Sequence, residues 1–186
     1  MTVAVALLVS LGLLVFLVIA FVAMYNGLVA LRMQVKNAWA QIDVQLKQRY
    51  DMIPNLVETV KGAANFEKST LESVMKARNA CMSAQGTRAV DDANNALTGT
   101  LRSLFAVVEA YPDLKTNANY TQLQETLVSM ESKIAFSRQF YNDSVARYNA
   151  TTQSIPNNFV ASLGNFQPAD MLAIAEAEKQ NVKVQF

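Results

Sequence analysis

The sequence predicts an all-α protein in which an N-terminal transmembrane helix is continuous with an elongated antiparallel four-helix bundle, followed by a C-terminal tail. Three observations predict this fold class. The first 24 residues carry no charge, four later segments repeat apolar residues with a period near 3.6, and the 186 residues include only 6 Gly and 4 Pro. So few Gly and Pro argue against disorder and against an all-β fold. We expect a span over residues 1–24, a bundle over 25–155 and a tail over 156–186.

The span is defined by its length and by the charges that follow it. Only Thr2 and Ser10 are clearly polar within residues 1–24, and about 20 apolar residues cross a hydrocarbon core about 30 Å thick. A cleaved secretory signal is the competing interpretation. It is disfavoured because no Lys or Arg precedes the apolar run. Arg32 and Lys36 follow the span, so the positive-inside rule predicts a single-pass protein with its N-terminus outside and its bundle in the cytoplasm.

The first helix is expected to run from Val3 to about Tyr50, because no Pro interrupts the chain where the apolar run ends. Pro54 disfavours the helical conformation at the residue before it, and Asp51 can cap a following helix, so we expect a tight hairpin over residues 51–54. A single kinked helix is the alternative, because the apolar phase continues through Ile53.

Three further helices complete the predicted bundle. The second runs from about Pro54 to Ala84 and stops near Gly86, and the third ends at the turn signal of residues 111–113. The fourth has the clearest heptad pattern, typical of a helix packed lengthwise on its neighbours. Its apolar positions are Tyr120, Leu123, Leu127, Met130, Ile134, Tyr141, Val145 and Tyr148. In the tail, a short helix over residues 168–179 is compatible with the pattern.

Composition excludes most familiar chemistry. The 16 basic and 15 acidic residues are nearly balanced, without the basic runs and interleaved aromatics that nucleic-acid binding uses. The chain has no His and a single Cys, so it offers neither a zinc site nor a His-activated nucleophile. Cys81 lies in a helical pattern, and we expect it to be a small buried residue. We therefore expect no catalytic residue, no metal and no cofactor.

A set of polar residues near the predicted hairpin is the candidate structural or assembly cluster. Its members are Gln41, Asp43, Gln45, Arg49, Asn55, Glu58 and Arg138. They are interpreted as helix caps and inter-helix hydrogen bonds that fix register, with a recognition or assembly surface as the alternative. We expect Arg138 to pair with a carboxylate such as Asp43 or Glu58, or else to be solvated. Arg32 and Lys36 are candidate contacts to lipid headgroups.

Several stretches resemble the LemA family of bacterial membrane proteins. They are residues 25–29, 38–49, 53–62 and 110–115, Tyr141-Asn142, Tyr148-Asn149 and residues 184–186. The resemblance implies a four-helix bundle behind an N-terminal span in the bacterial cytoplasmic membrane, with the bundle in the cytoplasm. It implies no catalytic activity. It also implies relatives associated with magnetosome membranes and genes near those of membrane proteolysis.

The function that we expect is a non-enzymatic, membrane-anchored scaffold that assembles with itself and organises or remodels the membrane. Large apolar residues off the main stripes predict a closed homo-oligomer, because exposed apolar patches usually mark interfaces. They are Phe66, Val90, Val107, Val128, Phe136 and Phe140. The alternative is an adaptor or regulator of a membrane quality-control protease. An enzyme is the least supported hypothesis. The expected partners are membrane lipids and further copies of the chain, with a protease under the alternative and no nucleic acid.

Overall fold

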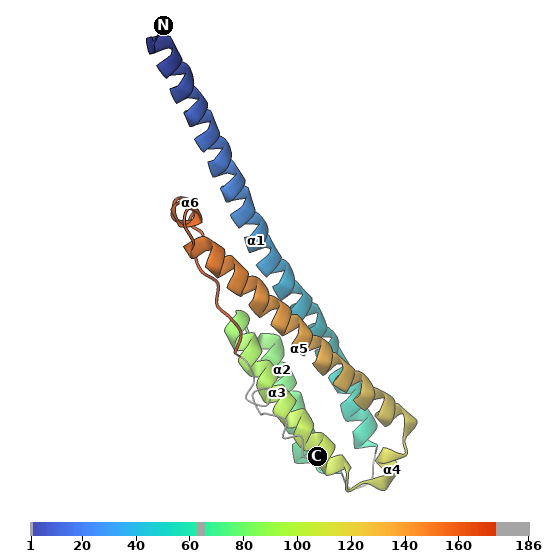
Figure 1. The fold of residues 1–186 in the computed structure, drawn as a ribbon. Coiled ribbons are helices and arrows are strands. Elements are labelled where there is room, and N and C mark those ends of the chain that lie inside the picture. The colour runs from blue at the N-terminus through green and yellow to red at the C-terminus, as the bar shows by residue number, and fades with distance from the viewer. Residues whose placement is uncertain (1, 63–65, 174–186) are drawn as a thin grey trace, which may run out of the picture. The chain divides into compact units, whose positions relative to one another are not determined.

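The computed structural model describes residues 2–62 and 66–173, and within these ranges the regular structure is entirely helical (Figure 1). The expected all-α class is therefore confirmed. The helices are α1 (Thr2–Lys61), α2 (Lys68–Ser83), α3 (Thr87–Val108), α4 (Pro112–Lys115), α5 (Ala118–Gln153) and α6 (Asn157–Leu163). The apolar N-terminal segment is the first part of α1, as the sequence predicts.

Helix α1 continues through Pro54, so the hairpin expected at residues 51–54 is wrong and the single-helix alternative holds. A proline inside a helix costs about 3 kcal/mol, because its nitrogen has no hydrogen to donate to the carbonyl four residues earlier. Here that carbonyl belongs to Tyr50, and it accepts a hydrogen bond of 2.8 Å from Arg78 Nε instead. Beyond the proline, Leu56, Val57 and Val60 are buried, so packing favours continuing the helix.

The first break in the helical chain lies about ten residues later than expected. Helix α2 begins at Lys68 and ends at Ser83, and α3 begins after Gly86. Gly86 has a φ of 84°, a left-handed conformation that glycine adopts without steric cost. Gly86 is the N-cap residue of α3, and α2 has already ended at Ser83, so the chain breaks near the predicted place although Gly86 does not itself end α2. Helices α2 and α3 pack against one another.

Two compact units divide the described residues. The first contains residues 2–39 and 139–171, and the second contains residues 40–62, 66–138 and 172–173. Helices α1 and α5 each supply a segment to both units.

Helix α5 presents the apolar heptad that the sequence predicts. Its buried positions include Tyr120, Leu127, Ile134 and Val145.

The first unit ends in an extended segment held along α5, here called the strap (residues 166–171). Tyr148 Oη donates to the carbonyl of Gln167 at 2.9 Å, and Tyr141 Oη donates to that of Asp170 at 3.1 Å. Asn149 bonds Ala169 twice, with its Nδ2 donating to the carbonyl and its Oδ1 accepting from the backbone N–H, both at 2.9 Å. The expected helix over residues 168–179 is therefore absent from its described part, residues 168–173; the remainder lies outside the described residues.

Helix α6 and the residues after it lie against α1 in the same unit. Phe166 is buried and packs edge-on against Tyr25, with ring centroids 5.4 Å apart. The guanidinium carbon of Arg32 lies 4.7 Å from the centre of the Phe166 ring. A Cβ at Gly164 would meet Phe166 at 2.5 Å and Tyr25 at 3.1 Å, so only glycine fits this close approach. The sequence did not predict α6.

The core of the second unit is apolar apart from a few buried polar groups. The buried apolar residues of α1 to α3 in this unit are Ile42, Leu46, Tyr50, Ile53, Leu56, Val57, Val60, Leu71, Val74, Cys81, Leu97, Leu101, Leu104 and Val108. Cys81 is thus a small buried residue, as expected. Burial raises the pKa of its thiol, which keeps it protonated at neutral pH. Arg49, Asp91 and Asn94 are the buried polar exceptions.

Candidate functional site: a buried polar network in the second unit

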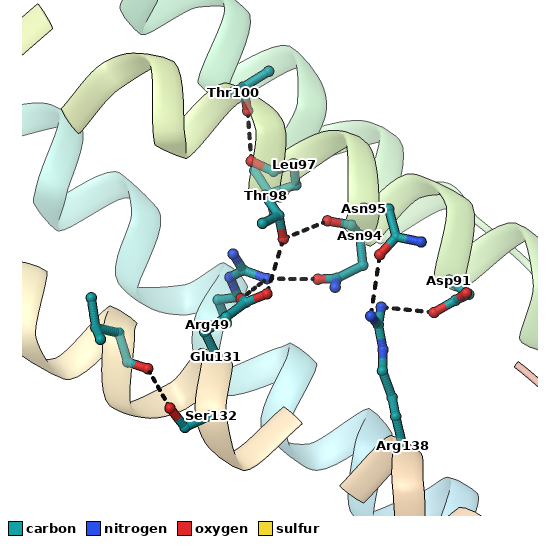
Figure 2. Close-up of polar contacts among 11 residues, drawn as sticks. Arg49, Asp91, Asn94, Asn95, Leu97, Thr98, Thr100, Glu131, Ser132 and Arg138 are labelled. Carbon is teal, nitrogen blue, oxygen red and sulfur yellow. Dashed lines mark hydrogen bonds and ion pairs between the residues drawn. The ribbon is translucent and has the colours of Figure 1, made fainter. Parts of the chain in front are cut away.

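Arg49 is the centre of a polar network that joins α1, α3 and α5 (Figure 2). Only 3% of the residue is exposed. Its Nη1 atom lies 2.7 Å from Glu131 Oε2 on α5 and donates to Asn94 Oδ1 on α3 at 3.1 Å. The other carboxylate oxygen of Glu131 accepts from the Thr98 hydroxyl at 3.3 Å. A single guanidinium on α1 thus has partners on two other helices.

Arg138 forms a second ion pair in the same network. Its Nη2 atom lies 2.7 Å from Asp91 Oδ1, and its Nη1 atom donates to Asn95 Oδ1 at 3.1 Å. Asp91 is only 4% exposed. Figure 2 shows the side chains of Asp91 and Asn95, both on α3, directed toward the guanidinium of Arg138. The network therefore contains two arginines and two carboxylates, and its formal charges cancel.

The helical period explains how three helices converge on this site. Asp91, Asn94 and Thr98 follow one another at spacings of three and four, so they lie on one face of α3. Glu131 and Arg138 are seven residues apart on α5, which also places them on one face. The α3 face continues directly into the buried Leu97. The polar residues therefore occupy the first turns of an otherwise apolar stripe.

Burial sets the electrostatics of the network. Burial lowers the pKa of the Arg49 guanidinium, and the Glu131 carboxylate opposes that shift. The Nε atoms of Arg49 and Arg138 and the Nδ2 atom of Asn94 are buried without a hydrogen-bond partner in the described residues. Buried ion pairs often contribute little net stability, because desolvation offsets their attraction, whereas losing one partner costs several kcal/mol. Such a network favours one register between helices over the alternatives.

The polar groups of the network pair with one another between helices. Arginine does not lose its proton in proteins, so neither guanidinium serves as a general base. The described residues contain no group of three or more Asp, Glu, Cys or His side chains placed to hold a metal ion. The arrangement can hold helices in register and recognise charge.

The structure brings together only two residues of the sequence-predicted cluster, Arg49 and Arg138. Gln41, Asp43, Asn55 and Glu58 are exposed on α1, and Gln45 is half-buried. Arg138 pairs with a carboxylate, as expected, but the suggested partners Asp43 and Glu58 are wrong, because the carboxylate is that of Asp91. Asp43 and Glu58 lie on the exposed side of α1, whereas Asp91 is buried on α3 within reach of Arg138. The role of the exposed four as an assembly surface stays a prediction.

Sequence reasoning missed Asp91, Asn94 and Glu131. A signal for them is present: Asp91 and Asn94 lie in register with the buried Leu97 and Leu101. Polar residues on a core stripe are rarely buried without partners. A heptad spacing links Glu131 to Arg138 in the same way.

The first part of α1 is the other candidate functional element. It is long and apolar enough to cross a membrane, and its most apolar window is entirely exposed. Of the two predicted headgroup contacts, Lys36 is exposed and Arg32 is half-buried against Phe166. Large apolar side chains that remain exposed in a folded chain mark contact with lipid or protein.

Comparison with known proteins identifies the family. The model of the LemA family matches residues 38–186. The chain belongs to the LemA family. It is 25% identical to Magnetosome protein MamQ 1 of Paramagnetospirillum magneticum over 183 residues, covering 82% of this chain and 67% of that protein. It is 24% identical to Protein LemA of Metamycoplasma hominis over 166 residues, covering 87% of this chain and 74% of the relative.

A third relative is matched over less of its own length. Magnetosome protein MamQ of Magnetospirillum gryphiswaldense is 25% identical over 174 residues, and the match covers 80% of this chain and 61% of that protein. Taken with the exposed apolar segment of α1, the family makes this a membrane-associated helical protein with one candidate transmembrane helix.

Proposed function

We propose that this LemA-family protein is a non-enzymatic scaffold, anchored by α1 in the bacterial cytoplasmic membrane, that assembles into a closed homo-oligomer and organises or remodels the bilayer. The proposal places the N-terminus outside and the helices after the span in the cytoplasm. The relatives named as magnetosome proteins support a role in a membrane-bound assembly. The basic residues Arg32 and Lys36 after the span support the orientation.

The observation that carries the proposal is an exposed apolar stripe on α5, formed by Val128, Phe136 and Phe140. These residues are spaced by multiples of four, so they lie along one face of the helix. Phe136 is 73% exposed and Val128 is 57% exposed. The other residues that the sequence singled out for assembly, Phe66, Val90 and Val107, are half-buried. Two exposed phenylalanines and a valine on one helix face favour contact with another protein surface.

The buried polar network fits a scaffold because an assembling surface must be presented in one register. In the proposal, α1, α2, α3 and α5 form the antiparallel four-helix bundle that the sequence predicts. The short connections between these helices support it. Arg49 and Arg138 then fix the height of α1 and α5 against α3. The exposed faces of the bundle repeat from one copy to the next.

The test is the mass of the full-length protein in nanodiscs and mild detergent. Wild type should form a discrete oligomer, and Val128→Ser with Phe136→Ser should shift the mass to smaller species. Val44→Ser is the matched control, because Val44 is 54% exposed but lies alone among polar neighbours on α1. It should leave the mass unchanged.

A wild-type monomer across a range of concentrations would contradict the proposal and would favour the adaptor hypothesis. Thiol labelling tests the orientation separately, in a Cys81→Ala background. A cysteine at Thr151 should resist impermeant reagents in intact cells, and one at Thr2 should react. The reverse pattern would show that the orientation is wrong.

A further inference from the structure

Helix α6 carries apolar side chains that stay exposed within the part of the chain that the structure describes, residues 2–62 and 66–173. Phe159 and Leu163 are four residues apart on the same face, and they are 65% and 78% exposed. Ile155, just before the helix, is 79% exposed. The opposite side of α6 is packed, because Val160 and Ala161 are buried. The helix therefore has one face committed to the protein and another that is open.

The place where α6 packs on α1 indicates which environment the exposed apolar face of α6 contacts. Phe166 holds the end of α6 to α1 through Tyr25 and Arg32, and the close approach at Gly164 fixes the contact. Figure 1 shows α6 beside α1, within the same unit. Tyr25 is the first residue after the predicted span. Residues 25–32 rise about 10 Å along the helix axis, enough to cross the headgroup region on one side of a bilayer, which is about 5–8 Å deep.

The charges of this region favour a lipid surface. No acidic residue occurs between Ser144 and Ala169, and the one charged residue there is Arg147. On α1, Arg32 and Lys36 are basic, and the first acidic residue is Asp43. Anionic headgroups therefore meet no carboxylate along these two stretches. Tyr25, which packs against Phe166, is a residue type that is enriched at the membrane–water boundary.

We propose that α6 is an interfacial membrane-contact helix, with Ile155, Phe159 and Leu163 inserted at the boundary between the headgroups and acyl chains of the bilayer that α1 crosses. The inference rests on the proposed span, and it does not require self-assembly. Under this proposal, α6 contacts the bilayer through apolar side chains alone. In this proposal, the contact of Phe166 with Tyr25 and Arg32 holds α6 at a fixed distance from the end of the span.

The experiment measures lipid contact directly in the full-length chain. Phe159→Cys and Leu163→Cys are made separately in a Cys81→Ala background, labelled with bimane and reconstituted in phosphatidylcholine–phosphatidylglycerol nanodiscs. Half of the nanodiscs carry acyl chains brominated near the headgroup. We expect several-fold stronger bromine quenching at residues 159 and 163 than at a Val44→Cys control, which is also exposed but lies on α1 in the second unit, outside the proposed assembly stripe. Because all three positions are exposed, we expect each variant to fold, and circular dichroism checks this.

A probe at Leu14→Cys separates failure of the inference from failure of the span. Leu14 is exposed and central in the apolar run, so chains brominated near the methyl end should quench it. If residue 14 is quenched and residues 159 and 163 are quenched no more than residue 44, the role of α6 is wrong and the span stands. A blue shift at 159 without bromine quenching would also overturn the inference, since the face would then contact protein. If residue 14 is not quenched, the proposed anchor itself fails, and the inference with it.

Discussion

The two units hold their irregular or buried polar groups by different means. In the second unit, charged side chains pair with one another between helices, as Arg138 does with Asp91. In the first unit, neutral side chains of α5 bond the backbone of the strap, as Asn149 does with Ala169. Charge pairs choose one register among several for regular helices, which already satisfy their own backbone. An extended segment lacks that internal bonding, so its carbonyls and N–H groups need side-chain partners.

The largest expected effect is the removal of one charge from the second unit. Arg138→Leu leaves Asp91 buried without its cation, and we expect unfolding in urea to become easier by about 3–5 kcal/mol. Adding Asp91→Leu to the same chain should recover most of that loss, because no isolated charge remains. Chemical denaturation of both variants checks this. If the double variant is as unstable as the single one, then the loss comes from packing and the charge pair is not its cause.

A smaller and local effect is expected in the first unit. Asn149→Ala removes two hydrogen bonds to Ala169, and we expect a loss of about 1–3 kcal/mol that falls mainly on the strap. Hydrogen exchange should rise over residues 166–171 while the second unit keeps its protection. Asn149→Ser, which retains a shorter polar side chain, is the matched control and should give an intermediate rate. Equal loss of protection in both units would remove the distinction between them.

In the second unit, the side chain of Arg78 also bonds a backbone group, as Asn149 does in the first unit, and substitution of Arg78 tests how much this contributes. Its Nε serves the Tyr50 carbonyl that Pro54 leaves without a helical donor. Arg78→Ala should cost about 1–2 kcal/mol in the wild-type background. In a Pro54→Ala background the residue 54 N–H can donate instead, so the same substitution should cost measurably less. A double-mutant cycle by urea denaturation measures the difference, and strict additivity would show that Arg78 acts elsewhere.

The smallest expected effect is a change in how the stability of the first unit depends on pH under alkaline conditions, and it concerns Tyr148. Burial raises the pKa of Tyr148 above its usual value near 10, so folding favours the neutral phenol, which can donate to Gln167. That contribution is present below the unfolded-state pKa and is lost as the pH rises through the raised value. Tyr148→Phe should lower the melting temperature slightly at neutral pH and show a weaker decline above pH 10 than wild type. Parallel curves for the two proteins would contradict this.

Residues with a helical period could be predicted from the sequence, and those that bond across elements could not. The apolar run of α1, the break near Gly86 and the heptad of α5 each depend on local pattern, and all three are found. The hairpin at Pro54 is not, because the partner that satisfies the Tyr50 carbonyl is Arg78, 28 residues away. The strap is similar, since Tyr141 and Tyr148 follow the heptad whether or not their hydroxyl groups bond a distant backbone. Arg138 was expected to pair with a carboxylate and does, yet its partner lies on α3, which the pattern of α5 does not indicate.

The ion pairs of the network differ in how they should respond to salt. At physiological ionic strength the Debye length is about 8 Å, and mobile ions screen charges that they can approach. The side chain of Glu131 is 41% exposed, whereas that of Asp91 is 4% exposed. Added salt therefore weakens the Arg49–Glu131 pair and barely affects the Arg138–Asp91 pair. One end of the same network responds to the ionic composition around the protein, while the other end stays insulated from it.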